Sequence, residues 1–170
     1  MKSSDTLLIS RKEVASILRM GDCITAVESA FRLHAEQKAI TPKVLGFHSR
    51  NGGFHIKAGA LELSRSYFVV KVNANFSGNP KQHALPSIQG VIVVMDGTNG
   101  KLLSLIDSIE ITIMRTGAAT AVAAEYLALP DATTATICGC GNQGRISLTA
   151  LMEVRKLKKI YAFDIDEAQV

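Results

Sequence analysis

The segment Ile137–Gly144, with the sequence ICGCGNQG, carries three glycines in the order G-x-G-x-x-G. The stretch Thr133–Cys138 predicts a buried strand, and Arg145–Val154, after the glycines, predicts a helix. A second predicted strand, Lys159–Asp164, ends in an acid twenty residues beyond the last glycine. A strand, glycine turn, helix and strand with this spacing form the context that the dinucleotide-binding fingerprint requires. We therefore expect the first βαβ unit of a Rossmann domain here.

Each glycine of this motif has its own expected task. Gly139 permits the tight turn after the strand, Gly141 lets the backbone approach a pyrophosphate, and Gly144 lets the helix pack closely on the strand. Asn142 and Gln143, between the last two glycines, are expected to bind the cofactor with them. The helix N-terminus offers free amide groups and a partial positive charge to the phosphates. The alternative is a chance glycine pattern in a structural turn.

Asp164 is the acid at the end of the second predicted strand. A carboxylate at this position accepts hydrogen bonds from both hydroxyls of the adenosine ribose. It also repels a 2′-phosphate, and the next residue is Ile165 rather than an arginine. The sequence therefore favours NADH over NADPH as the cofactor.

Composition limits the partners of this chain. It has 170 residues, of which 47% are hydrophobic and 20% charged, and its net charge is +4. Apart from a short cluster at Arg155–Lys159, the basic residues are scattered over the chain. The small positive charge favours anionic small molecules as partners, and its scatter indicates no nucleic-acid partner. The apolar run Leu7–Ile9 is too short for a signal peptide, and no stretch approaches the roughly 18 residues of a membrane span.

Cysteine and histidine usage predicts a cytoplasmic protein without a metal site. Three cysteines form no disulfide framework, which suits a reducing compartment. A zinc site would need further Cys or His partners beside Cys138 and Cys140. The four histidines lie far apart in the sequence, at His34, His48, His55 and His83.

The chain before the glycine motif predicts an α+β region. A capping box of Ser10 and Glu13 starts a first helix, which Gly21 ends. Asp22 caps a second helix, and Pro42 closes the helical part. The pattern then changes to strands, a polar loop and a long helix of small residues that allow close packing. The expected elements are strands at Lys43–Ser49 and Phe54–Ala60 around an Asn51-Gly52 turn, a strand at Tyr67–Asn73, a loop at Ala74–Ser87, strands at Ile88–Met95 and Lys101–Ile106, and a helix at Met114–Leu129.

Three stretches of this chain resemble the ornithine cyclodeaminase/μ-crystallin family: VVKVNANFSGNP (Val69–Pro80), MRTGAATAVAAEYLA (Met114–Ala128) and ICGCGNQG (Ile137–Gly144). The resemblance implies an α/β protein in which residues 1–129 form a substrate-binding and dimerisation domain. Residues 130–170 would then be the truncated start of a Rossmann NAD(P)-binding domain. It further implies amino-acid or imine chemistry and a homodimer that pairs through the N-terminal sheets.

Four residues match functional positions of the family. Lys71 matches the substrate-site lysine, Arg115 the arginine that binds the substrate carboxylate near the cofactor, Ser87 a cofactor-contacting threonine, and Asp164 the ribose-binding acid. Lys71 also interrupts the apolar run Phe68–Val72, so its amine can point into a cleft. Burial there would lower the pKa of the amine and make it a proton donor or acceptor. An exposed position on an edge strand is the alternative.

Arg115 and Thr116 are expected at the start of a helix. Helix N-termini disfavour cations, so an arginine there indicates an anionic ligand that the guanidinium grips with two hydrogen bonds. A surface arginine is the alternative. The Thr116 hydroxyl either contacts a cofactor phosphate or caps the helix.

Two departures from the family pattern concern the substrate. Lys43 stands where ornithine cyclodeaminases carry a carboxylate-binding arginine. A lysine is a point charge and cannot form the two parallel hydrogen bonds of a guanidinium group. The stretch with His55 and Lys57 has no acid where those enzymes meet the distal amine of ornithine. A keto acid, cyclic imine or short amino acid therefore fits better than ornithine. Lys57 either joins Lys71 and Arg115 in a cationic carboxylate site or is a solvated lysine.

Length is the third departure, because family members are roughly twice as long and a complete domain of this fold has about six strands. Only two such strands are expected here, and the catalytic aspartate of the cyclodeaminases falls in the missing part. We therefore expect an incomplete sequence that is inactive alone, with a genuine short protein as the alternative. The complete protein is expected to be a ketimine reductase, an alanine-dehydrogenase-like enzyme or a cyclodeaminase. The alternatives are a non-catalytic μ-crystallin-like binding protein and a dimerisation module.

Overall fold

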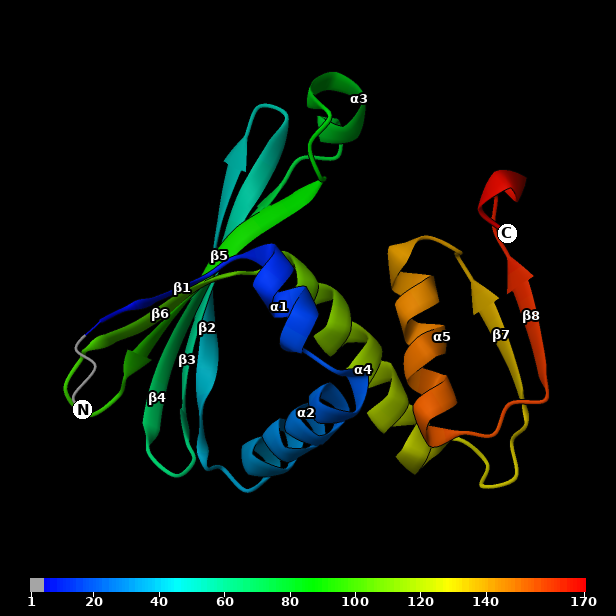
Figure 1. Cartoon of the computed structure of the whole chain (residues 1–170), viewed down its shortest axis with the longest axis horizontal. Helices are drawn as coiled ribbons and strands as arrows, with labels where there is room; N and C mark the ends of the chain where they lie inside the picture. The colour runs from blue at the N-terminus through cyan, green and yellow to red at the C-terminus, as the bar shows by residue number, and fades with distance from the viewer. Residues whose placement is uncertain (1–4) are drawn as a thin grey trace. The chain divides into compact units, whose positions relative to one another are not determined.

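A computed structural model describes residues 5–170, which fall into two compact units (Figure 1). Of the described residues, 5–17 and 32–110 form the first unit, and 18–31 and 111–170 form the second. The α/β class expected from the sequence is confirmed. The first unit holds β1 (Leu7–Ile9), α1 (Arg11–Ile17), β2 (Ala39–Ser49), β3 (Gly52–Glu62), β4 (Ser66–Asn75), α3 (Asn79–His83), β5 (Ile88–Asp96) and β6 (Leu102–Asp107). The second holds most of α2 (Met20–Ala35) and α4 (Ile109–Leu127), followed by β7 (Thr134–Cys138), α5 (Asn142–Val154), β8 (Lys159–Phe163) and η1 (Glu167–Gln169).

The first unit is built on one six-stranded sheet in the order β1-β6-β5-β4-β3-β2. Strands β2 to β6 pair antiparallel as sequential hairpins, which confirms the expected strands and extends their ends. The first turn falls one residue earlier than expected, because Ser49 pairs with Gly52. Two elements were not foreseen: β1, which pairs parallel to β6, and the short helix α3 inside the expected loop.

The N-terminal helices differ from the sequence-based boundaries. The capping box is confirmed, since the Ser10 N–H group donates to Glu13 Oε2 at 2.7 Å and the Glu13 N–H group donates to Ser10 Oγ at 3.4 Å. Helix α1 ends at residue 17, and Gly21 lies inside the first turn of α2 rather than ending a helix. Asp22 is likewise within the first turn of α2 and does not cap it. Pro42 lies in β2, where the pairing with β3 is irregular and tolerates a residue without an N–H group.

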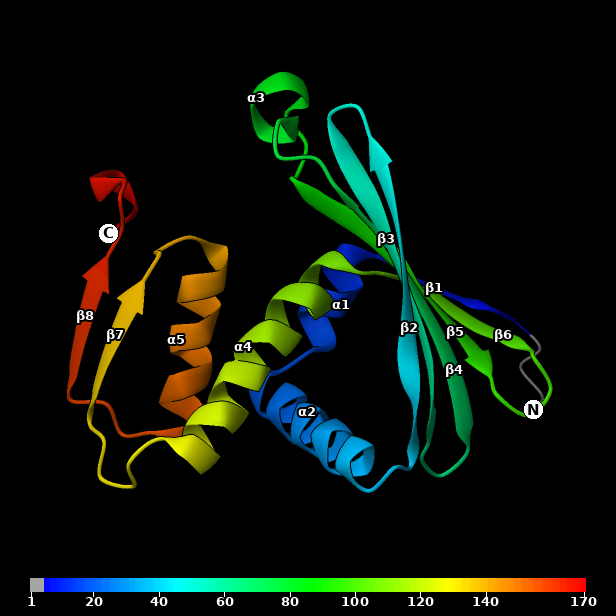
Figure 2. The ribbon, with the colours of Figure 1, turned by 180° about the vertical axis from the view of Figure 1, so that it is seen from behind.

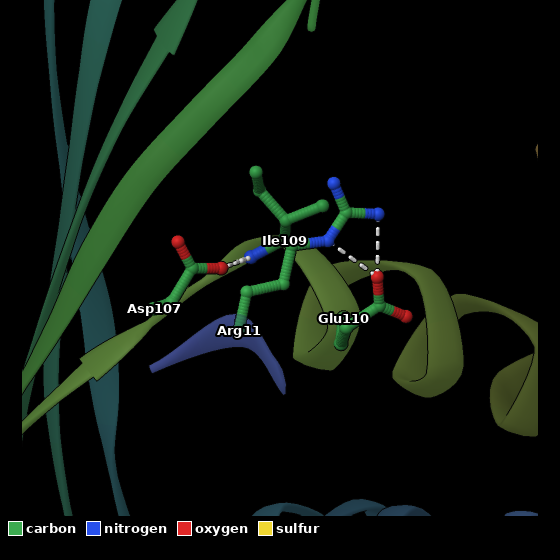
Figure 3. Close-up of polar contacts among 4 residues, drawn as sticks. All are labelled: Arg11, Asp107, Ile109 and Glu110. Carbon is green, nitrogen blue, oxygen red and sulfur yellow. Dashed lines mark hydrogen bonds and ion pairs between the residues drawn. The ribbon is translucent and has the colours of Figure 1, made fainter. Parts of the chain in front are cut away.

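Helix α4 begins five residues before the expected start at Met114. Asp107 Oδ1 accepts a hydrogen bond from the Ile109 N–H group at 2.9 Å, which satisfies a free amide of the first turn. The Glu110 carboxylate pairs with the Arg11 guanidinium at 2.6 Å (Figure 3). These contacts join the beginning of α4 to β6 and α1 within the first unit.

Small residues let the helices of the second unit pack closely around its core. A Cβ added at Gly117 of α4 would lie 2.8 Å from the Ile146 carbonyl oxygen of α5, so only glycine allows this approach. The expected close packing of the alanine-rich helix is therefore confirmed. The buried core residues are Met20, Cys23 and Ile24 from α2, Ala118, Ala121 and Val122 from α4, and Ala150 from α5.

The β7–α5–β8 segment forms the βαβ unit that the glycine motif predicts. Strands β7 and β8 pair parallel, from Thr134 with Lys159 to Cys138 with Phe163. Helix α5 lies against β7, and Figures 1 and 2 show the helix beside the strand from opposite sides. The glycine turn thus stands at the carboxyl end of β7, where nucleotides bind in folds of this kind.

Candidate nucleotide and substrate sites

Two glycines of the motif are required by the backbone itself. Gly139 has a φ of +94°, which L-residues rarely adopt, and its N–H group donates to the Phe163 carbonyl oxygen at 2.8 Å. A Cβ added at Gly144 would lie 1.8 Å from the Gly139 carbonyl oxygen. These contacts set the turn against β8 and bring the start of α5 onto it.

Gly141 has a different explanation. It precedes the first residue of α5 with an ordinary φ of −70°. A Cβ added there would meet no protein atom within 4 Å. The open side of this residue faces a hollow of about 590 Å³. A ligand that comes close to the backbone accounts for the missing side chain, and a pyrophosphate against the amides of a helix N-terminus fits this requirement. The hollow is lined by Thr136, Ile137, Cys138, Gly139, Gly141, Asn142, Gln143, Gly144 and Ser147.

Asp164 is joined to the glycine turn by hydrogen bonds. Its Oδ2 atom accepts from the Cys140 N–H group at 2.6 Å, and its Oδ1 atom accepts from the Asp166 N–H group at 3.0 Å. The backbone N–H groups of Asp166, Cys140 and Ile165 hold the pKa of this carboxyl below its ordinary value. Each carboxylate oxygen keeps acceptor capacity for a further donor such as a ribose hydroxyl.

Arg145 is a residue of this site that the sequence analysis missed. Its Nε atom donates to the Cys140 carbonyl oxygen at 2.8 Å, and Nη2 donates to the Gln169 carbonyl oxygen at 2.7 Å. The peptide groups of Cys140 are therefore held by Asp164 on one side and by Arg145 on the other. The only sequence signal for this role is the position of Arg145 directly after the third glycine.

Protonation of Asp164 is expected to weaken the second unit only at low pH. Because its native-state pKa is lowered, the carboxylate stabilises the fold above its unfolded-state pKa of about 3.9, and this stabilisation is lost as the pH falls through the native value. The unfolding free-energy difference between wild type and Asp164→Asn should be constant near neutral pH and shrink below about pH 4. Urea unfolding across pH measures it, with Asp131→Asn as a control for charge. A difference that is largest at low pH would contradict this account.

On the sheet of the first unit, the register brings two candidate lysines together. Lys57 of β3 lies directly opposite Lys71 of β4, so both are on one face of the sheet. Lys71 is half-buried and Lys57 is exposed. Like charges in directly opposite positions are unfavourable, and an anion between them would offset the repulsion. Lys43 pairs with Ala58, the neighbour of Lys57, and is therefore on the opposite face. The register does not support its expected share in the same site.

The remaining candidates lie on α4 and in the loop before β5. Arg115 is exposed, and it stands in the second turn of α4, six residues after its first residue. The argument from a helix N-terminus therefore does not apply to it. Thr116 does not cap the helix, because its hydroxyl donates to the Thr112 carbonyl oxygen at 2.7 Å. Ser87 precedes β5, and its carbonyl oxygen accepts from the Phe76 N–H group at 2.8 Å.

Two further observations concern metal ions and membranes. Among residues 5–170, no group of three or more His, Cys, Asp or Glu side chains is arranged to hold a metal ion. No helix in the described part of the chain has the length and apolarity to cross a membrane.

Residues 4–170 match the model of the ornithine cyclodeaminase/mu-crystallin family. The chain belongs to this family. Within it, the chain is 31% identical over 163 residues to an alanine dehydrogenase of Archaeoglobus fulgidus, covering 96% of this chain and 49% of that protein. The chain spans about half the length of the curated relatives that it matches.

Solved structures of family members have the same fold. An archaeal alanine dehydrogenase dimer with bound NAD superposes with a TM-score of 0.92 at 31% identity, over 96% of this chain and 50% of that one. The Δ1-pyrroline-2-carboxylate reductase of Thermococcus litoralis, in complex with NADH and L-proline, gives a TM-score of 0.87 at 34% identity, over 96% of this chain and 51% of that one. The resemblance identified from the sequence is confirmed.

Proposed function

We propose that the protein containing this chain is a nicotinamide-dependent oxidoreductase of a small amino, keto or imino acid. The observation that carries this proposal is the open side of Gly141, next to a carboxylate that the fold holds at the end of β8. Family relatives solved with NAD or NADH support it. The names of these relatives, an alanine dehydrogenase and a Δ1-pyrroline-2-carboxylate reductase, support the substrate class.

The nucleotide end of the site has a physical assignment for each group. The amides at the start of α5, with Asn142 and Gln143, would hold the pyrophosphate, and Asp164 would accept from the ribose hydroxyls. The negative charge of Asp164 favours NAD(H) over NADP(H). When bound, this cofactor supplies or accepts the hydride. Ser87 and Thr116 are proposed as further cofactor contacts.

At the substrate end of the site, positively charged side chains are proposed to bind the substrate. Lys71 and Lys57 would attract the substrate carboxylate, and Arg115 would grip it with two hydrogen bonds. Lys71, which is half-buried, would hold or transfer a proton at the reacting group. No acid stands on β3 beside Lys57 to bind a distal amine, which disfavours ornithine.

A second copy of the chain is proposed to cover the other face of the sheet. That face exposes apolar side chains that the register aligns across four strands, and the relative from archaea is a dimer. A sedimentation mass equal to one protomer would contradict this. The exposed fractions are 54% for Leu45, 51% for Phe47, 41% for Phe54, 37% for Phe68 and 36% for Val91.

The division into a substrate domain at 1–129 and a nucleotide domain from 130 stays a prediction. The proposed activity requires the further strands that a complete nucleotide domain contains. The test is therefore made with the protein expressed from its complete reading frame.

The experiment is an NADH assay with three substrates: pyruvate plus ammonium, a cyclic imino acid, and ornithine. We expect net NADH consumption with one of the first two. Release of ammonia from ornithine without net NADH consumption would instead indicate a cyclodeaminase. NADH binding without any turnover would contradict the enzyme and favour a binding protein.

A further inference from the structure

We infer that Asn73 is a substrate-binding residue, whose side-chain amide donates a hydrogen bond to the substrate carboxylate, and that Ser108 positions this amide. The inference deepens the proposed function and rests on it. It arises from a polar cluster that joins β4, β5 and the beginning of α4 within the first unit.

Asn73 lies on the same face of the sheet as the two lysines. It follows Lys71 by two residues in β4, and side chains two apart in a strand point to one face. Its cross-strand partners are His55 on β3 and Gly90 on β5. Lys71 has Lys57 as its partner on β3. Asn73 is half-buried. Its amide therefore stands in the next cross-strand row to the lysine pair.

Ser108 determines which way this amide is turned. The residue is 0% exposed and lies between β6 and α4. Its N–H group donates to the Gly90 carbonyl oxygen at 3.0 Å, and its Oγ donates to Asn73 Oδ1 at 3.2 Å. A fully buried hydroxyl requires such a partner. Because the bond occupies the amide oxygen, the Nδ2 group of Asn73 points away from Ser108.

Gly90 leaves the space in which these two side chains meet. A Cβ added there would lie 2.2 Å from the Val72 carbonyl oxygen, 2.6 Å from Asn73 Oδ1 and 2.8 Å from Ser108 Oγ. Any side chain at this position would displace the amide or the hydroxyl. The pair is therefore held between β4, β5 and the residue that links β6 to α4, all within the first unit.

The orientation gives Asn73 a chemical task. Among the described residues, the hydrogen-bond partner of its amide is Ser108, on the oxygen, so the two Nδ2 hydrogens remain as donors. A neutral donor in the row next to Lys71 adds a directed hydrogen bond for a carboxylate without adding a further positive charge to the lysine pair.

The test compares Asn73→Ala, Asn73→Asp and Ser108→Ala with Asn75→Ala, an exposed amide two residues further along β4. Asn73→Ala should raise the KM for the keto or imino acid about tenfold, as expected for a lost hydrogen bond to a charged group, while the NADH KM and kcat stay close to wild type. Ser108→Ala should raise the same KM by a smaller factor, and Asn75→Ala should not change it.

The pH dependence of KM in Asn73→Asp distinguishes substrate binding by this residue from a purely structural role. Its new carboxylate repels the substrate, so KM should rise by about a hundredfold at neutral pH and fall again as the pH is lowered and the group is protonated.

Calorimetric titration with pyruvate, L-alanine and L-proline follows carboxylate binding without turnover. The inference is overturned if wild type binds none of these acids, or if all Asn73 variants bind them as wild type does. It is also overturned if Asn73→Ala lowers kcat, NADH affinity and thermal stability together. A failure of the proposed function is distinct, because wild type would then bind an acid but not consume NADH.

Discussion

Gly144→Ala is expected to abolish nucleotide binding and to destabilise the second unit. The added methyl group would lie 1.8 Å from the Gly139 carbonyl oxygen, a backbone atom that no rotamer change can move. Gly139 itself is held at a φ of +94° and bonded to β8, so the turn has little freedom to relax. Forced overpacking of this kind costs about 1–3 kcal/mol or more. Urea unfolding and a fluorescence titration with NADH measure the two effects.

Gly141→Ala is the matched control for this substitution. Its methyl group meets no protein atom within 4 Å, so the free energy of unfolding should stay close to that of wild type. If a pyrophosphate approaches the backbone at this residue, NADH binding should nevertheless weaken at least about tenfold. A Gly141→Ala protein that binds NADH as wild type does would show that the nucleotide lies elsewhere. A Gly144→Ala protein of unchanged stability would contradict the packing described for the turn.

Lys71→Met is expected to cause the largest loss of activity. Methionine has a similar length but offers no charge and no proton, and loss of a general acid or base lowers rates by about 10²- to 10⁴-fold. The loss should appear mainly in kcat, while NADH affinity remains, because the groups proposed to hold the pyrophosphate and the ribose, at the start of α5 and at Asp164, belong to the other unit. Stopped-flow measurement of NADH oxidation, with the most active of the three substrates in the NADH assay, gives the rate of the chemical step.

Two control variants bracket this result. Lys57→Met should raise the substrate KM more than it lowers kcat, because Lys57 is exposed and is proposed only to attract the carboxylate. Lys101→Met, in the turn between β5 and β6, should leave both constants unchanged. A Lys71→Met protein with wild-type kcat would show that Lys71 takes no part in the chemical step.

The sequence predicts the βαβ unit well, because every part of its signal is local. The glycine spacing, the two strands and the acid at Asp164 all lie within one short segment. Helix α4 was placed too late because its first residues, Ile109–Ile113, are mostly β-branched and resemble a strand. Its true start depends on the cap from Asp107, a signal that the strand pattern hides.

The face of a strand residue is harder to predict than the strand. Lys43 and Lys57 are predicted on one hairpin, but the register set at its turn, where Ser49 pairs with Gly52, decides which face each lysine occupies. A shift of this register by one residue would reverse the answer. The contact of Asn73 with Ser108 joins residues 35 positions apart. No local pattern carries such a contact, because it depends on the sheet register and on where α4 begins.

The most direct test of the nicotinamide site is a titration of the protein, expressed from its complete reading frame, with NADH and separately with NADPH. The account predicts saturable binding of NADH, weaker binding of NADPH because of the Asp164 charge, and a large loss of NADH affinity in Asp164→Asn. Absence of saturable binding of both nucleotides to a folded protein would contradict the central claim.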